Sequence, residues 1–159
     1  MKHSKIEIIE NTPRNLVKIF TSVFPMLDGK NYFTGELPPD LDRNGQIGMM
    51  ADNQQDWEVL WQATGTAAPG ALPRDTQAVM FMAANKAGHH VTTAVASAVK
   101  KHKEINLEWN VTYTPMADGE KRRVSFAVIL LPKAVGVSSH YNYFDQQPVV
   151  TTQPQSPSL

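Results

Sequence analysis

The 159-residue sequence contains no cysteine. This absence excludes disulfide bonds, thiolate metal sites and cysteine nucleophiles together. Long apolar runs are missing as well, because no stretch approaches the roughly 18 apolar residues that a membrane-spanning helix needs. The first residues carry lysine, but Glu7 interrupts Ile6–Ile9, so the apolar core of a signal peptide is missing. We therefore expect a cytoplasmic protein that does not bind a membrane.

An excess of charge is also missing, since 15 Lys and Arg residues balance 15 Asp and Glu residues. Dedicated nucleic-acid-binding domains are usually strongly basic, so this balance argues against that class. The charges are nevertheless uneven, because residues 31–75 are acidic and residues 76–133 are basic. Two such regions could recruit separate partners, although solvated surface explains the same distribution.

Motifs for catalysis and cofactor binding are missing too. The sequence has no Gly-x-Ser-x-Gly motif, no phosphate-binding loop and no dinucleotide fingerprint. We expect no cofactor and predict a non-enzymatic protein, while a catalytic site assembled from scattered residues stays open. The chain length suits one domain, which we assign to residues 1–144. Residues 145–159, rich in Pro, Gln, Ser and Thr, predict a disordered tail.

The first third of the chain predicts a strand, a helix and a long loop. Lys5–Ile9 has the composition of a short strand. The apolar residues after Pro13 recur with helical period, and Pro25 ends that helix. Frequent Gly, Pro and Asn over residues 28–46 predict a loop, and Ile47–Met50 predicts a brief strand.

The clearest helix lies between Asp52 and Gly65. Asp52 is predicted to cap its start, and Gln55 completes a capping box three residues later. Trp57 and Trp61 share one apolar face, and Gly65 is suited to end the helix in a left-handed conformation.

Residues 75–103 leave two interpretations open. Alanines at helical spacing predict one long helix with a face of small residues, in which Gly88 costs about 1 kcal/mol relative to alanine. The competing interpretation is a strand over Ala78–Ala84 followed by a helix from Lys86.

The last third predicts β-structure. Apolar and polar residues alternate over Ile105–Tyr113, which predicts a half-buried strand with its large side chains turned inward. Pro115–Gly119 supplies a turn, and Arg122–Leu131 returns as the second strand of a hairpin. This second strand is apolar on both faces, so it is predicted to be central, with Lys5–Ile9 or a strand near Val135–Tyr143 as its other neighbour. We therefore predict an α+β fold in which two or three helices pack on one face of a small antiparallel sheet containing this C-terminal β-hairpin.

Protein–protein interaction or self-assembly into a homo-oligomer is the function that we predict for this small accessory protein. Aromatic residues are enriched at interface hot spots, and they gather in the second helix and before the tail. The same cluster before the tail could instead close the core as a final strand. The candidate partner-binding residues are Trp57, Trp61, Tyr141, Tyr143 and Phe144.

Nucleic-acid binding is the alternative. Basic residues would contact phosphates, and Trp109 and Tyr113 would stack on bases if they were exposed. Both rings alternate with aliphatic residues, which favours a place in the core instead. The basic candidates are Lys100, Lys101, Lys103, Lys121, Arg122 and Arg123.

Two further patterns are weaker. The segment Asp40–Ile47 resembles the opening of an EF-hand calcium loop, but Ala51 stands where that loop needs a bidentate Glu. The adjacent His89 and His90 would point about 100° apart on a helix, so they are poorly placed to chelate one ion. A calcium ion would be held weakly, with Asp40, Asp42, Asn44 and the Gln46 carbonyl as its donors.

Overall fold

The computed structural model describes residues 24–38, 45–133 and 136–146. The described residues are mostly β, with 54% strand and 10% helix, so the predicted α+β fold with two or three helices is wrong. The described residues contain one helix and two sheets. In chain order the elements are β1 (Tyr32–Glu36), β2 (Ile47–Ala51), α2 (Gln54–Thr64), β3 (Thr76–Met82), β4 (His89–Lys101), β5 (Glu104–Pro115), β6 (Ser125–Pro132) and β7 (Gly136–Asp145).

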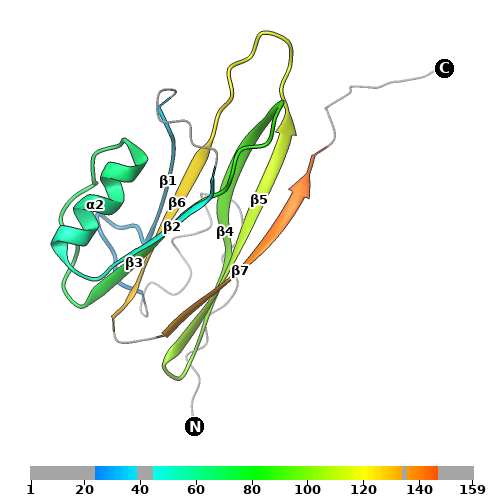
Figure 1. Cartoon of the computed structure of the whole chain (residues 1–159). Coiled ribbons are helices and arrows are strands. Elements are labelled where there is room, and N and C mark those ends of the chain that lie inside the picture. Colours follow the sequence, from blue (N-terminus) through cyan, green and yellow to red (C-terminus); the bar gives the residue numbers. More distant parts are fainter. Residues whose placement is uncertain (1–23, 39–44, 134–135, 147–159) are drawn as a thin grey trace.

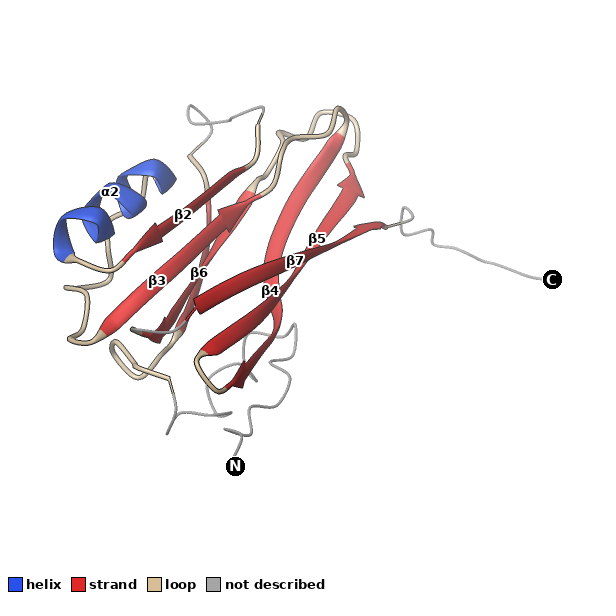
Figure 2. Cartoon of the chain, turned by 60° about the horizontal axis from the view of Figure 1, so that its bottom comes forward, coloured by secondary structure: helices blue, strands red, loops and turns tan. Residues whose placement is uncertain are grey.

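The two sheets pack against each other, and α2 covers the other face of the larger sheet (Figure 1, Figure 2). The larger sheet has the order β1-β6-β3-β2 and is antiparallel throughout, whereas the smaller has the order β4-β5-β7 with β5 and β7 parallel. The ring centroids of Trp61 in α2 and Phe126 in β6 are 5.7 Å apart. Those of Phe81 in β3 and Trp109 in β5 are 5.6 Å apart. The core therefore lies on both faces of the larger sheet.

β6 is the central strand that its sequence predicts. It pairs with β1 on one side and β3 on the other, and its residues 126–131 are buried. Successive side chains of a strand point to opposite faces, so alternate residues of β6 meet α2 and the smaller sheet. Gly35 of β1 lies opposite Phe126, and a Cβ at Gly35 would stand 2.8 Å from the Phe126 ring. This close approach requires glycine.

The predicted hairpin between Ile105–Tyr113 and Arg122–Leu131 is wrong. β5 pairs with β4 and β7, so β5 and β6 lie in different sheets. The predicted alternation in β5 is confirmed, because its apolar side chains up to Val111 are buried and the residues between them are more exposed. A strand with one polar face suits a sheet covered on one side, whereas β6 needs cover on both sides. The strand predicted near Val135–Tyr143 exists as β7, but its neighbour is β5.

Residues 75–103 form β3 and β4 in place of the predicted long helix. The alternative of a strand followed by a helix is right for β3 and wrong for β4. Thr and Val occupy much of residues 91–99, and their branched side chains are restricted in a helix but pack well on a pleated sheet. The predicted face of small residues does not exist, because β3 and β4 belong to different sheets: Ala78 is buried on the α2 side of β3, and Ala98 is buried on β4.

Gly88 distinguishes the observed turn before β4 from a helix by experiment, since both sequence interpretations place Gly88 in a helix. It precedes β4 with φ of 74°, a left-handed conformation that costs other residues about 1 kcal/mol or more. Gly88→Ala is therefore expected to lower the free energy of unfolding by about 1 kcal/mol, whereas in a helix it would raise it by a similar amount. Urea denaturation shows whether the substitution lowers or raises the free energy of unfolding. Gly88→Asn is the control, because Asn tolerates a positive φ better than Ala and should lower the free energy of unfolding less than Gly88→Ala does.

The helix between Asp52 and Gly65 is confirmed as α2, with one correction at its start. Asn53, and not Asp52, is the N-cap, and its side chain accepts a backbone hydrogen bond from the first turn at 2.8 Å. Gly65 ends the helix with φ of 72°. Trp57 and Trp61 lie on the buried face, as the apolar stripe predicts.

Part of the predicted loop 28–46 is strand β1, which the sequence hides because the strand is short and contains a glycine. The strand predicted at Ile47–Met50 is confirmed as β2. The strand predicted at Lys5–Ile9, the helix after Pro13 and residues 147–159 of the tail lie outside the described residues. Among the residues that are described, no helix has the length and apolar character to cross a membrane.

One edge of β4 is closed by other parts of the molecule. Three alternate N–H groups on the side of β4 that faces away from β5 donate hydrogen bonds to the larger sheet or to the segment that leads into it. The donors are Val91, Thr93 and Val95, and the acceptors are the Arg123 carbonyl (2.9 Å), the Ser125 hydroxyl (2.9 Å) and the Tyr32 hydroxyl (3.1 Å).

Candidate functional site

β7 forms the open edge of the smaller sheet, shown in orange in Figure 1. It is ten residues long, and β5 is its one partner among the described strands. The N–H groups of Gly136 and Gln146 donate to the carbonyls of Lys103 and Tyr113 at the two ends of this ladder. Alternate residues of a strand bond to the same neighbour, so the even-numbered residues of β7 bond to β5. The N–H and C=O groups of the odd-numbered residues point away from β5, where no described strand pairs with them.

The side chains of the odd-numbered residues hold β7 on the core. The ring centroids of Tyr141 and Phe81 are 4.3 Å apart, and the Trp109 indole N–H donates to the Ser139 hydroxyl at 3.0 Å. The contact between Tyr141 and Phe81 places β3 next to β7. At the opposite edge of the larger sheet, the Tyr32 hydroxyl places β1 next to β4. β2, the edge strand beyond β3, therefore lies on the same open side of the molecule as β7.

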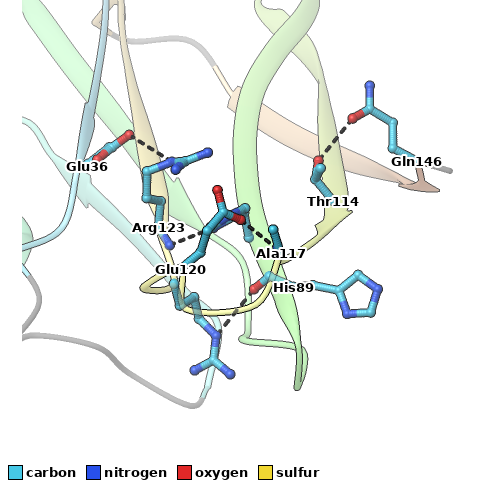
Figure 3. A network of polar contacts seen from close by, with 9 residues as sticks. Glu36, His89, Thr114, Ala117, Glu120, Arg123 and Gln146 are labelled. Atoms are coloured by element: carbon cyan, nitrogen blue, oxygen red, sulfur yellow. Dashed lines mark hydrogen bonds and ion pairs between the residues drawn. The ribbon is translucent and has the colours of Figure 1, made fainter. Parts of the chain in front are cut away.

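Polar pairs on the outer face of the smaller sheet fix the register between β5 and β7. A register shift of one residue would turn the inward side chains outward, so these pairs support the observed pairing. The Thr114–Gln146 pair is visible in Figure 3. The pairs are Asn106 with Ser138, Asn110 with Asn142 at 3.3 Å, and Thr114 with Gln146 at 3.0 Å.

Lys86 ties the end of β7 to the segment between β3 and β4. Its Nζ lies 2.5 Å from the Asp145 carboxylate and 5.1 Å from the centre of the Tyr113 ring. The Tyr113 ring is nearly parallel to that of Tyr143, with 6.5 Å between centroids. Burial, and to a lesser extent the neighbouring Tyr143, raise the pKa of Tyr113. The ion pair is exposed, so we expect it to orient the strand end more than to stabilise the fold.

Large apolar side chains are exposed on this open side. Tyr143 is 53% exposed, Phe144 is 49% exposed, and Met50 of β2 is 54% exposed. Met50 lies opposite Val79, two residues from Phe81 on β3, so it projects toward the layer of the smaller sheet. We call the odd-numbered backbone groups of β7, together with these three side chains, the β7 edge.

The β7 edge lacks the devices that usually protect a sheet edge. Long exposed edges are blunted in natural proteins by lysine, proline, bulges or extreme shortness. Gly136–Asp145 contains no Lys, Arg or Pro, and its one carboxylate is at the last position. β4, by contrast, has a bulge between Val95 and Ser97 and ends in two lysines, and the larger sheet ends in strands of five residues. β7 is therefore the candidate binding edge.

A second polar cluster joins the segment after β5 to β4 (Figure 3). The buried His90 accepts the Arg123 backbone N–H at Nδ1 (3.0 Å), so the neutral ring carries its proton on Nε2 and donates it to the Glu120 carboxylate at 2.9 Å. Glu120 also accepts the Ala117 N–H at 2.7 Å. Arg123 reaches Glu36 of β1 at 3.8 Å. Every one of these contacts is internal, so we assign the cluster to the fold.

Glu120 gives this cluster a pH dependence. The Ala117 N–H, and then His90, hold the pKa of Glu120 below its usual 4.5. The ionised carboxylate is therefore favoured by folding, and its contribution is present above pH 4.5 and is lost as the pH falls through the lower folded pKa. Glu120→Gln should lower the urea midpoint at pH 7, and the difference from wild type should shrink below pH 4.5. Asp118→Asn, an exposed carboxyl in the same segment, is the control, and a constant difference across this range would contradict the assignment.

The predicted partner-binding residues separate into two groups. Trp57 and Trp61 are buried in the core beneath α2, with their ring centroids 5.6 Å apart. Tyr141, Tyr143 and Phe144 lie on β7, where the first packs on the core and the other two are exposed. The sequence does not reveal the backbone groups of Val137 and Ser139 in the same edge, because their role follows from the pairing of the strand and not from their side chains.

The basic candidates for nucleic-acid binding lie at opposite ends of the smaller sheet. Lys100, Lys101 and Lys103 are at the turn between β4 and β5, and the group beginning at Lys121 follows the other end of β5. The twelve residues of β5 separate them, which corresponds to about 40 Å. Trp109, the predicted stacking ring, is fully buried. Arg122 donates from Nε to the His89 carbonyl at 3.3 Å, and Arg123 faces Glu36.

The remaining candidate sites add no chemistry. Within residues 24–38, 45–133 and 136–146 no group of three His, Asp or Glu side chains could hold a metal ion. A hollow beside α2 has Glu58 as its one ionisable lining residue. The calcium donors Asp40, Asp42 and Asn44 lie outside the described residues, and Gln46 is exposed.

No protein-family model matches this chain, and neither a curated protein nor a solved structure matches it.

Proposed function

We propose that this protein is a non-enzymatic interaction module that binds a partner protein by adding a β-strand along the β7 edge. In strand addition, main-chain hydrogen bonds supply affinity and side chains flanking the edge supply specificity. The observation that carries the proposal is the contrast between the two edges of the smaller sheet. In β4 the outward N–H groups of Val91, Thr93 and Val95 are bonded within the molecule. In β7 the outward groups of five odd-numbered residues pair with no described strand, and the strand contains no Lys or Arg.

The side chains around the β7 edge fit this role. Tyr143 and Phe144 are adjacent in a strand, so they project to opposite faces of the sheet and would contact an added strand from both sides. Aromatic rings with a polar end are typical interface anchors. The cytoplasm is the compartment that we expect, because the chain has no cysteine. Nucleic-acid binding has no comparable support, because the basic groups are far apart.

A peptide selection tests strand addition without knowledge of the natural partner. Peptides selected from a random displayed library against the whole protein should slow amide hydrogen exchange at Ser139, Tyr141 and Tyr143. Tyr143→Pro removes one outward N–H without touching the ladder to β5, because residue 143 faces away from β5. This substitution should raise the dissociation constant of the selected peptides about tenfold or more.

Two further variants complete this test. Tyr143→Lys places a protective charge on the edge and should have the same effect without a proline. Val59→Ala, which trims an exposed side chain on α2, should leave peptide affinity unchanged. If the selected peptides protect amides elsewhere, or if both Tyr143 variants bind them normally, strand addition at β7 is wrong.

A further inference from the structure

The pairing geometry of β7 also indicates which partner fits it. We infer that the added strand is β7 of a second copy, running antiparallel across a two-fold axis at Tyr141, an inference that rests on the proposed function. The groups available for pairing belong to the odd-numbered residues. These are Val137, Ser139, Tyr141, Tyr143 and Asp145.

An axis at Tyr141 uses all of these groups. In antiparallel pairing, two residues opposite each other exchange both hydrogen bonds when their N–H and C=O groups face the partner. With the axis at Tyr141, Tyr141 faces its own copy, Ser139 faces Tyr143, and Val137 faces Asp145. Moving the axis to residue 140 or 142 leaves one odd-numbered residue at the end of each strand unpaired. Among these symmetric registers, the axis at Tyr141 is therefore the one that uses the full length of the edge.

The side chains are compatible with this register. On the outer face His140 lies opposite Asn142 of the second copy, and Ser138 lies opposite Phe144. No two like charges face each other, since the one carboxylate, Asp145, lies opposite Val137 and already pairs with Lys86. Self-complementarity of this kind is what an interface between identical surfaces requires.

The exposed apolar residues support a second copy as the partner. Among the described residues four large apolar side chains are exposed, and three of them, Met50, Tyr143 and Phe144, lie on the open side where the second copy would sit. The joined sheet would have the order β4-β5-β7-β7-β5-β4. Its outer edges would be the β4 edges that each molecule already closes with Tyr32, Ser125 and Arg123. These bonds, together with the bulge after Val95 and the two lysines that end β4, oppose growth beyond the dimer.

The absence of cysteine permits a cross-linking test without background. In the proposed register His140 and the partner's Asn142 form a non-hydrogen-bonded pair, with Cα atoms about 4.5 Å apart, which suits a disulfide. His140 and its own copy are diagonal, at about 7–8 Å, which does not. Under mild oxidation an equal mixture of His140→Cys and Asn142→Cys should form about tenfold more cross-linked dimer than either variant alone.

Solution mass completes the test. Sedimentation of the full wild-type chain should show a dimer, and Tyr143→Pro and Tyr143→Lys should raise its dissociation constant about tenfold or more. Met50→Ala should raise this dissociation constant less, and Val59→Ala should leave it unchanged. A wild-type monomer at every concentration, or a dimer whose cysteine mixture does not cross-link preferentially, overturns the second-copy inference. Peptide binding at Ser139, Tyr141 and Tyr143 would in that case still support strand addition, whereas the loss of both results removes both proposals.

Discussion

Replacing Trp109 with alanine is expected to lower the free energy of unfolding by about 3–5 kcal/mol, the usual cost of deleting a large buried ring. Trp109 is fully buried, lies 5.6 Å from the ring of Phe81 in the larger sheet, and donates its indole N–H to Ser139 of β7. One side chain thus joins three strands. Urea denaturation followed by far-UV circular dichroism measures the loss.

A matched variant separates packing from hydrogen bonding at this position. Trp109→Phe keeps an aromatic ring but removes the indole N–H, so it should lose clearly less stability than Trp109→Ala. Ser139→Ala removes the acceptor alone and should cost about 1–3 kcal/mol at most. If Trp109→Ala were as stable as wild type, the inward orientation of β5 and the contact between the sheets would both be wrong.

Tyr32→Phe is expected to lower the free energy of unfolding by about 1–3 kcal/mol, because it leaves a buried N–H without an acceptor. The Tyr32 hydroxyl accepts the Val95 N–H at 3.1 Å and thereby joins the edge of β4 to the larger sheet. Phenylalanine preserves the ring, so the loss reports the hydrogen bond. Thermal or urea denaturation at neutral pH measures it, and an unchanged stability would show that Val95 finds another acceptor.

The same residue predicts a response to alkaline pH. Burial raises the pKa of Tyr32 from 10.0 to about 12. The folded state therefore favours the neutral phenol, whose contribution is full below pH 10 and is lost as the pH rises from 10 toward 12. The stability difference between wild type and Tyr32→Phe should shrink over this interval. Because Tyr113 also has a raised pKa, Tyr113→Phe is the control.

Local patterns predicted several elements correctly, for reasons that the structure shows. α2 follows from its apolar face with Trp57 and Trp61 and from the glycine that ends it at Gly65. β5 follows from the alternation that begins at Ile105, and the central place of β6 follows from its two apolar faces. In each case the chemistry of consecutive residues is enough to fix the periodicity, because the side chains of the element itself reveal which face is buried.

The same local logic fails over residues 75–103. Alanine favours a helix in isolation, yet Ala78 is buried on the face of β3 that α2 covers, and Ala98 is buried on β4 of the other sheet. Burial against distant strands outweighs helix propensity, which amounts to less than about 1 kcal/mol per residue. The predicted hairpin fails for a similar reason, because adjacency along the chain does not reveal which of two sheets a strand joins.

In the candidate site, too, the sequence predicts some features and misses those that depend on distant parts of the chain. The sequence predicts Tyr141, Tyr143 and Phe144 as candidate contact residues by their aromatic character alone. It cannot show that β7 ends a sheet, because an edge is defined by the strand that is missing beside it. It also cannot separate these rings from Trp57 and Trp61, whose side chains the helix layer buries.

By itself, the sequence determined the period of α2, β5 and β6, because period depends on which neighbouring residues are apolar. The tertiary structure alone decided that β5 and β6 belong to different sheets, that β4 is closed at Val91, Thr93 and Val95, and that no described strand pairs with the outer edge of β7. Those outcomes depend on hydrogen bonds between residues far apart in the chain, such as the one from Val95 to Tyr32, and no local pattern records them.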